Sequence, residues 1–158
     1  MKGHTMIAEE RDMKANTKPG LHKGVRHPPS ILIIDDDVEA ALIVATVFWQ
    51  LNCNTMFVTD GGDAQRRLVG GKADLVILDW VLGEKLHADQ VLEKCIHIID
   101  KYRDPSRGKI KLITYSGLSE ANIQLPQNQY FEHLAHWQKP INPRHLIKNI
   151  MPLIGGHS

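Results

Sequence analysis

The sequence has few cysteines, little net charge and no long hydrophobic run. Its 158 residues include two cysteines, Cys53 and Cys95, which show no metal-ligand spacing and make a disulfide framework unlikely, so a reducing cytoplasm is the expected compartment. The formal net charge of +1 gives no general attraction to nucleic acid or to a membrane. No apolar run is long enough to cross a bilayer, and no segment has the apolar centre of a signal peptide. What remains is an ordinary soluble chain, long enough for one domain with its own core.

The beginning of the chain differs in composition from the rest. Residues 1–30 hold six Lys or Arg against three acidic residues, and large apolar side chains are scarce there. We expect residues 1–29 to form a flexible arm that ends at Pro28 and Pro29. The arm could be a basic docking tail, but the plainer alternative is a disordered leader, as at many chain termini. Residues 155–158 are expected to be a short tail.

From Ile31 onward, short apolar segments alternate with segments of helical character. The segments ILII, TMFV, ADLVIL, IKLITY and LAHW begin at residues 31, 55, 73, 110 and 134, and each is expected to be a strand. Helices are expected at 38–51, 62–69, 88–102 and 143–154, whereas Pro126 makes a full helix over 119–134 doubtful. In the first helix, one face carries Val38, Leu42, Ala45 and Trp49. The alternation predicts an α/β fold, a doubly wound five-stranded parallel sheet between two helical layers.

Polar residues of complementary kinds follow four of the five expected strands. The first strand leads into Asp35, Asp36 and Asp37, the third into Asp79, the fourth into Ser116, and the fifth into Lys139. Because the carboxyl ends of parallel strands meet at one edge of a sheet, these side chains should lie close together. Carboxylates form a hard oxygen site that suits Mg²⁺, and an ammonium and a hydroxyl can hold phosphoryl oxygens. Asp79 is then a candidate nucleophile that accepts a phosphoryl group.

Simpler interpretations exist for the same residues. A solvated turn between strand and helix would also explain Asp35 and Asp36, and Asp37 is expected to cap the helix that follows. Lys139 could be a surface residue ahead of a proline, and Asp79 could be an ordinary turn residue. It is the occurrence of all these groups at successive strand ends that favours a common site.

In their order along the chain, these residues resemble the response-regulator receiver domain, the CheY-like domain of two-component signalling. The matching motifs are Asp35-Asp36, Asp79 in VILDW, Ser116-Gly117, and Lys139-Pro140 in WQKPI, and the resemblance covers about residues 30–154. It implies a flavodoxin-like (CheY-like) three-layer sandwich. It also implies transfer of a phosphoryl group to Asp79 from a histidine kinase or a histidine phosphotransfer protein. Such a domain catalyses only its own phosphorylation and dephosphorylation, so we do not expect a conventional enzyme.

The resemblance implies a role for each matching position. Mg²⁺ would be bound directly by Asp36, Asp79 and the backbone carbonyl of Val81, whereas Asp35 would act mostly through a water molecule. The phosphoryl oxygens would be bound by Lys139, Ser116 and the backbone groups of Trp80 and Gly117. Ser116 would then draw the loop that follows it inward.

Some positions leave alternatives open. Thr114 is a second candidate for the switching hydroxyl, although strand alternation favours Ser116. The aromatic switch position of the family falls on His136, with Trp137 next to it, so either side chain could move on phosphorylation. Tyr115 is expected only to pack in the core.

Two apolar positions bear on how long a phosphoryl group would last. In the family, the residues two after the acceptor Asp and two after the hydroxyl tune its lifetime. Here they are Val81 and Leu118, and neither can orient an attacking water molecule. We therefore expect slow self-dephosphorylation.

The sequence after residue 154 leaves no room for an output domain. A stand-alone receiver is therefore expected, one that relays the phosphoryl group or switches a downstream protein target. Direct contact with nucleic acid or a membrane is not expected, and a homodimer is left open. One alternative is a pseudo-receiver that binds partners without phosphorylation. Another is an aspartate-nucleophile phosphohydrolase, but Val81 stands where that class has a second Asp.

Overall fold

Helices and strands alternate along the chain in the expected order. The computed structural model describes residues 27–70, 73–83, 86–102 and 108–154, so most of the expected arm and the tail at 155–158 lie outside the described residues. The elements are β1 (Ser30–Ile34), α1 (Val38–Gln50), β2 (Asn54–Val58), α2 (Gly61–Gly70), β3 (Leu75–Asp79), β4 (Val81–Leu82), β5 (Leu86–His87), α3 (Ala88–Tyr102), β6 (Ile110–Ser116), the 3-10 helix η1 (Glu120–Asn122), β7 (Phe131–Gln138) and α4 (Pro143–Ile154).

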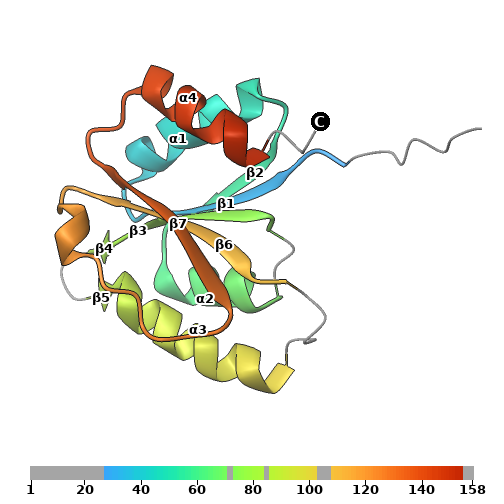
Figure 1. Ribbon diagram of the computed structural model, residues 1–158, viewed down its shortest axis with the longest axis vertical. Helices are drawn as coiled ribbons and strands as arrows, with labels where there is room; N and C mark the ends of the chain where they lie inside the picture. Colours follow the sequence, from blue (N-terminus) through green and yellow to red (C-terminus); the bar gives the residue numbers. More distant parts are fainter. Residues whose placement is uncertain (1–26, 71–72, 84–85, 103–107, 155–158) are drawn as a thin grey trace, which may run out of the picture.

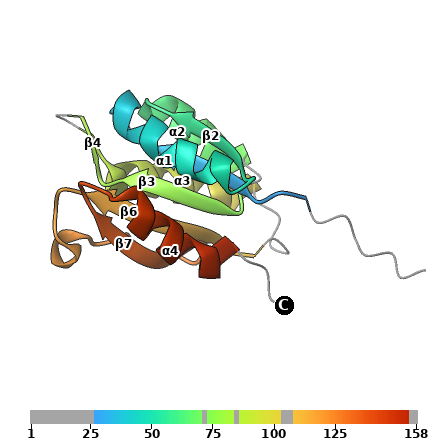
Figure 2. The ribbon, with the colours of Figure 1, turned by 90° about the horizontal axis from the view of Figure 1, so that it is seen from above.

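Five of the strands form one parallel sheet in the order β2-β1-β3-β6-β7. Helices α1 and α4 cover one face of this sheet, and α2 and α3 cover the other (Figure 1). Seen from above, α4 lies over the half of the sheet that contains β6 and β7 (Figure 2). The predicted three-layer α/β sandwich is confirmed. No helix within the described ranges is long and apolar enough to cross a membrane.

Side chains of the central strands alternate between the two helical layers, as the pleat of a strand requires. In β1, Ile31 and Ile33 pack with α1 and α4, whereas Leu32 and Ile34 pack with α2 and α3. Both sets are buried, which explains why β1 is apolar throughout. This alternation also decides on which side of the sheet the residues after each strand emerge.

Helix α1 begins as predicted, but the apolar face named from the sequence is not the face that it buries. Asp37 caps it, because its Oδ1 accepts the N–H groups of Glu39 and Ala40 at 3.0 and 3.1 Å. Of the face predicted from the sequence, Ala45 is buried, but Val38, Leu42 and Trp49 are 52%, 44% and 45% exposed. The residues that enter the core are Ala41, Val44, Ala45, Val47 and Phe48. Because α1 is apolar nearly all round, its hydrophobic pattern has no clear phase.

The doubtful helix between β6 and β7 is absent. Residues 117–130 contain only the single turn η1, and the segment then runs irregularly into β7. Asn128 organises its end, since Oδ1 accepts the N–H groups of Tyr130 and Phe131 while Nδ2 donates to Pro126. These side-chain bonds replace the backbone pairing that a helix would provide.

Strand β7 is longer than expected and contains a bulge. His133 pairs with Leu112 and Ala135 pairs with Ile113, so Leu134 is an extra residue in the ladder. In a regular strand, residues three apart point to opposite faces. The extra residue shifts the alternation by one, so His133 and His136 come to the same side.

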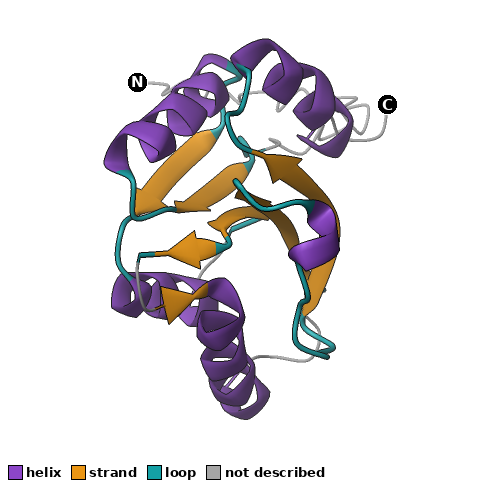
Figure 3. Cartoon of the chain, turned by 90° about the vertical axis from the view of Figure 1, so that its left-hand side faces the viewer, coloured by secondary structure: helices purple, strands orange, loops and turns teal. Residues whose placement is uncertain are grey.

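A short antiparallel pair, β4 and β5, follows β3 and was not predicted (Figure 3). Val81 pairs with His87 in it, and the chain turns at Gly83, whose φ of 79° is readily adopted only by glycine. A Cβ at Gly83 would lie 3.6 Å from Asp36 Oδ2, so this turn passes close to the acidic residues that follow β1.

Candidate functional site

Residues from three strand ends meet at the carboxyl edge of the sheet. Lys139, which follows β7, places Nζ 3.0 Å from Asp35 Oδ2 and 3.1 Å from Asp79 Oδ2. Asp35 and Asp79 continue the alternation of β1 and β3, so both carboxylates emerge on the face covered by α1 and α4. The predicted convergence of these three residues is what the structure shows.

Asp35 is fully buried and is bound on both oxygens. Its Oδ1 accepts the N–H of Asp37 at 2.9 Å, and Oδ2 accepts Lys139 Nζ and the hydroxyl of Tyr115. A buried carboxylate needs such donors, because it has lost its water. Its partners come from the N-cap of α1, from β6 and from the β7–α4 connection.

Tyr115 has a larger part in the site than the sequence suggests. Its side chain is 1% exposed and packs in the core as expected, but its hydroxyl donates to Asp35. The Lys139 ammonium also lies 4.4 Å from the centre of its ring. Tyr115 pairs with Asp79 across β3 and β6, and this register could have been the clue to its position.

Asp79 is 4% exposed, and this burial dominates its electrostatics. Burial raises the pKa of Asp79 from 3.8 to about 6, although the Val81 N–H and Lys139 oppose the change. The nearby charge of Asp35 raises the pKa further. Burial lowers the pKa of Lys139, but the hydrogen bonds that Lys139 donates to Asp35 and Asp79 outweigh it, so the net change is upward. Lys139 is therefore held in its charged form, whereas burial destabilises the ionised form of Asp79.

Three carboxylates at this edge could hold a cation. Asp35, Asp36 and Asp79 each offer one oxygen, and the three oxygens lie within 4.8 Å of one another. Asp36 is exposed, whereas the other two are buried. Three acidic groups face one ammonium, and an all-oxygen donor set fits Mg²⁺. Val81 lies beside these carboxylates, because its backbone N–H donates to Asp79 Oδ1 at 3.1 Å.

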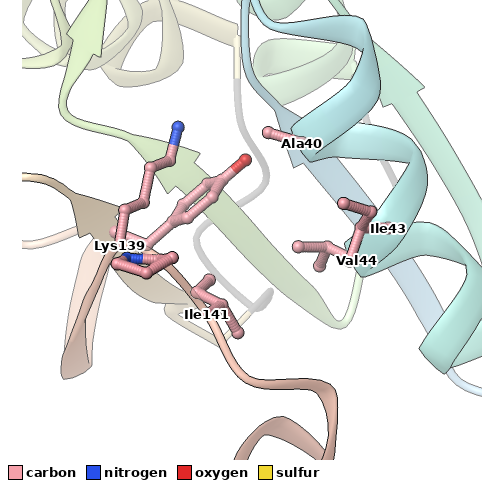
Figure 4. A pocket seen from close by; sticks show the side chains of 7 residues that line it. Ala40, Ile43, Val44, Lys139 and Ile141 are labelled. Atoms are coloured by element: carbon pink, nitrogen blue, oxygen red, sulfur yellow. The ribbon is translucent and has the colours of Figure 1, made fainter.

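A cavity of about 380 Å³ adjoins this group of residues. Ala40, Ile43 and Val44 of α1 line one side, and Lys139, Pro140 and Ile141 line the other, with Tyr115 between them. Figure 4 shows Ile43 and Val44 across the cavity from Ile141. Its walls are apolar except where Lys139 and Tyr115 reach the acidic residues.

Comparison with solved structures identifies the fold. A CheY-like receiver domain from Methanospirillum hungatei matches with a TM-score of 0.60 at 19% identity, over 81% of this chain and 94% of that one. A CheY-like receiver domain from Methylobacillus flagellatus matches with a TM-score of 0.60 at 19% identity, over 81% and 97%. The chemotaxis response regulator CheY4 of Vibrio cholerae gives 0.58 at 14% identity, over 80% and 98%. The chain has the fold of response-regulator receiver domains. No protein-family model matches the sequence, and neither does any curated protein.

Ser116 lies at the end of β6, the strand that pairs with β3. Ser116 is buried, and its Oγ accepts the N–H of Leu118 at 3.1 Å. Its carbonyl accepts the N–H of Lys139 at 2.8 Å, which ties the ends of β6 and β7 together. A Cβ at Gly117 would meet open space, so no close neighbour requires glycine there.

The backbone N–H of Trp80, which the resemblance noted in the sequence assigns to the phosphoryl oxygens, already has a partner. The backbone N–H of Trp80 donates to the carbonyl of Tyr115 at 3.1 Å. This bond extends the pairing of β3 and β6 one residue past Asp79. Trp80 could offer its N–H to a ligand only if the pairing opened at this point.

Thr114, the alternative hydroxyl, belongs to a separate hydrogen-bond network. Its Oγ1 lies 2.9 Å from both His133 Nε2 and His136 Nδ1, and His136 Nε2 lies 2.9 Å from the carbonyl of Leu118. A carbonyl only accepts, so neutral His136 carries its proton on Nε2 and accepts the Thr114 hydroxyl at Nδ1. Thr114 then accepts from His133. His136 is thereby connected to the loop after Ser116.

Proposed function

We propose that the protein is a receiver that accepts a phosphoryl group on Asp79 with the help of Mg²⁺. The observation that carries this proposal is Lys139 Nζ lying between Asp35 and Asp79, beside a third carboxylate from Asp36. The ionised Asp79 is destabilised by burial and by the nearby acidic groups, which favours its attack on phosphorus. The positive charge of Lys139 would stabilise the negative oxygens of an incoming phosphoryl group.

The reaction forms one bond and breaks one. An oxygen of Asp79 attacks phosphorus, the bond from phosphorus to the imidazole nitrogen of the donor breaks, and its electron pair leaves with the imidazole. Asp36, Asp79 and the carbonyl of Val81 would hold Mg²⁺, with Asp35 acting through water. When bound, Mg²⁺ neutralises the phosphoryl oxygens. Lys139 would supply the second positive charge, and Ser116 and Gly117 would bind the transferred group.

The partners follow from this chemistry. The donor is a phosphohistidine of a histidine kinase or of a histidine phosphotransfer protein, and the acceptor state acts on a downstream protein or passes the group on. We propose residues 30–154 as the receiver domain and the cytoplasm as its compartment. The signalling role makes the chain a phosphoacceptor and not a conventional enzyme.

The switch would run through Ser116 and His136. A phosphoryl group on Asp79 would accept the O–H of Ser116, whose oxygen already accepts the N–H of Leu118, so a shift of Ser116 would move the loop that contains Leu118. Movement of that loop would act on the Leu118 carbonyl, which His136 Nε2 contacts at 2.9 Å. Trp137 is the alternative switch residue.

The test is incubation with Mg²⁺ and acetyl phosphate, followed by intact-mass spectrometry. The wild type is expected to gain one phosphoryl group, lost in mild base as an acyl phosphate, and Asp79→Asn none. Asp37→Asn is the matched control: it changes an acidic residue at the same edge, keeps a helix-capping side chain and should be labelled normally. Labelling of Asp79→Asn, or none of the wild type, would contradict the proposal.

The pseudo-receiver alternative has two observations in its favour. The segment between β6 and β7 has only η1 where an α-helix was in question, and the Trp80 N–H is already used in strand pairing. A wild type that stays unlabelled over a wide range of Mg²⁺ and acetyl phosphate concentrations would favour this alternative.

A further inference from the structure

Tyr115 touches both members of the central ion pair. Its hydroxyl donates to Asp35 Oδ2, the same oxygen that lies 3.0 Å from Lys139 Nζ. Its ring lies 4.4 Å from that ammonium. Among the residues that the structure describes, no other side chain has a recorded hydrogen bond or ring contact to both Asp35 and Lys139, since Asp79 bonds only Lys139.

Asp35 would lose a partner during phosphoryl acceptance. Lys139 divides its hydrogen bonds between Asp35 and Asp79, and a phosphoryl group on Asp79 would draw the ammonium toward its own oxygens. Asp35 is fully buried, so it depends on the hydrogen-bond donors that already surround it. The Tyr115 hydroxyl would remain on Asp35 Oδ2 and keep it hydrogen-bonded.

The aromatic ring and the phenol proton of Tyr115 are also suited to keeping Lys139 and Asp35 in place during phosphoryl acceptance. Attraction between an ammonium and an aromatic face has no single donor direction, so Lys139 can shift toward Asp79 and stay over the ring. Burial, together with the hydrogen bond to Asp35, raises the pKa of Tyr115 far above its usual value. The phenol therefore stays a donor at any working pH.

We propose that Tyr115 is a positioning residue for phosphoryl acceptance: it holds Asp35 so that Lys139 is free to bind the phosphoryl oxygens. The inference rests on the proposed function of Asp79. Tyr115 itself touches neither the donor nor the transferred group, and it acts through Lys139.

The first measurement is the phosphorylation rate with acetyl phosphate at saturating Mg²⁺. Tyr115→Phe removes the hydroxyl and keeps the ring, and its maximum rate should fall about tenfold, as for loss of a charge-assisted hydrogen bond. The acetyl phosphate concentration at half-maximal rate should change little. Tyr130→Phe is the matched control, because Tyr130 also donates to an aspartate, Asp100, on the surface.

The second measurement separates positioning from a general effect on structure. Binding of beryllium trifluoride, an analogue of the phosphoryl group, is followed by tryptophan fluorescence in wild type, Tyr115→Phe, Lys139→Met and the double variant. Tyr115→Phe should weaken binding about tenfold when Lys139 is present and less than about twofold in the Lys139→Met background. Equal weakening in both backgrounds would overturn the proposal.

The outcomes also separate this inference from the proposed function. A wild type that takes no phosphoryl group rejects both. A labelled wild type with an unchanged Tyr115→Phe rate rejects only the role of Tyr115. If Tyr115→Phe is unfolded at the assay temperature, both measurements are made at a lower temperature at which circular dichroism shows the variant to be folded.

Discussion

Replacing Asp79 by Asn should stabilise the fold, and the gain should depend on pH. The pKa of Asp79 rises from 3.8 to about 6 because the carboxylate is buried. The folded state therefore binds a proton more readily than the unfolded state, and the ionised group opposes folding. A difference of about 2 units corresponds to about 3 kcal/mol at pH values well above 6.

The sign follows from proton linkage. As pH falls from about 7 to about 5, folded Asp79 becomes protonated while the unfolded residue stays largely ionised, so the wild type recovers about 1.3 kcal/mol. Asn mimics the neutral acid and cannot titrate. The stability advantage of Asp79→Asn should therefore be up to about 3 kcal/mol at neutral pH and shrink by about 1.3 kcal/mol at about pH 5.

Urea unfolding of both proteins at several pH values, with a metal chelator present, measures this difference. The effects of other titrating groups cancel in the comparison, because they are common to both proteins. Asp37→Asn serves as the control for replacing an exposed acidic residue at the same edge of the sheet. Adding Mg²⁺ should stabilise the wild type much more than Asp79→Asn. A difference between wild type and Asp79→Asn that stays constant over this pH range would refute the reasoning.

Two further predictions concern the surroundings of Asp79. Val81→Asn places a polar side chain two residues after the acceptor, where it can orient water, so the phosphorylated protein should lose its label several-fold faster in a timed mass-spectrometric assay; an unchanged lifetime would contradict this. Thr114→Val removes the hydroxyl between His133 and His136 and should cost about 1–2 kcal/mol in urea unfolding, for two lost hydrogen bonds. Thr46→Val, on the exposed face of α1, should cost much less, and equal losses would show that the histidine network contributes nothing special.

The strand ends were predictable because parallel strands impose a common edge. Once ILII and LVIL are recognised as buried strands, Asp35 and Asp79 must emerge at the same rim, and Lys139 follows from the last strand in the same way. No long-range information is needed for this step, since the pleat decides the face and the strand direction decides the edge.

Other features depend on contacts that local patterns do not carry. The phase of α1 could not be read, because apolar residues occupy both its faces, and only packing against α4 and the sheet selects Val44 and Phe48 for the core. The meeting of His133 and His136 on Thr114 depends on the bulge at Leu134, which is set by the pairing of β7 with β6. The hydroxyl of Tyr115 looks like core filling until the register with Asp79 is known.

The two apolar faces of α1 have a practical consequence for anyone who produces this protein. Val38 and Leu42 are about half exposed and contribute little to the packed interior, whereas Val44 and Phe48 lie beneath them in the core. Charged replacements at the two outer positions should improve solubility while leaving the melting temperature almost unchanged. Replacements at Val44 and Phe48 would disturb the core and lower stability. Solubility and stability can therefore be changed independently at different positions of α1.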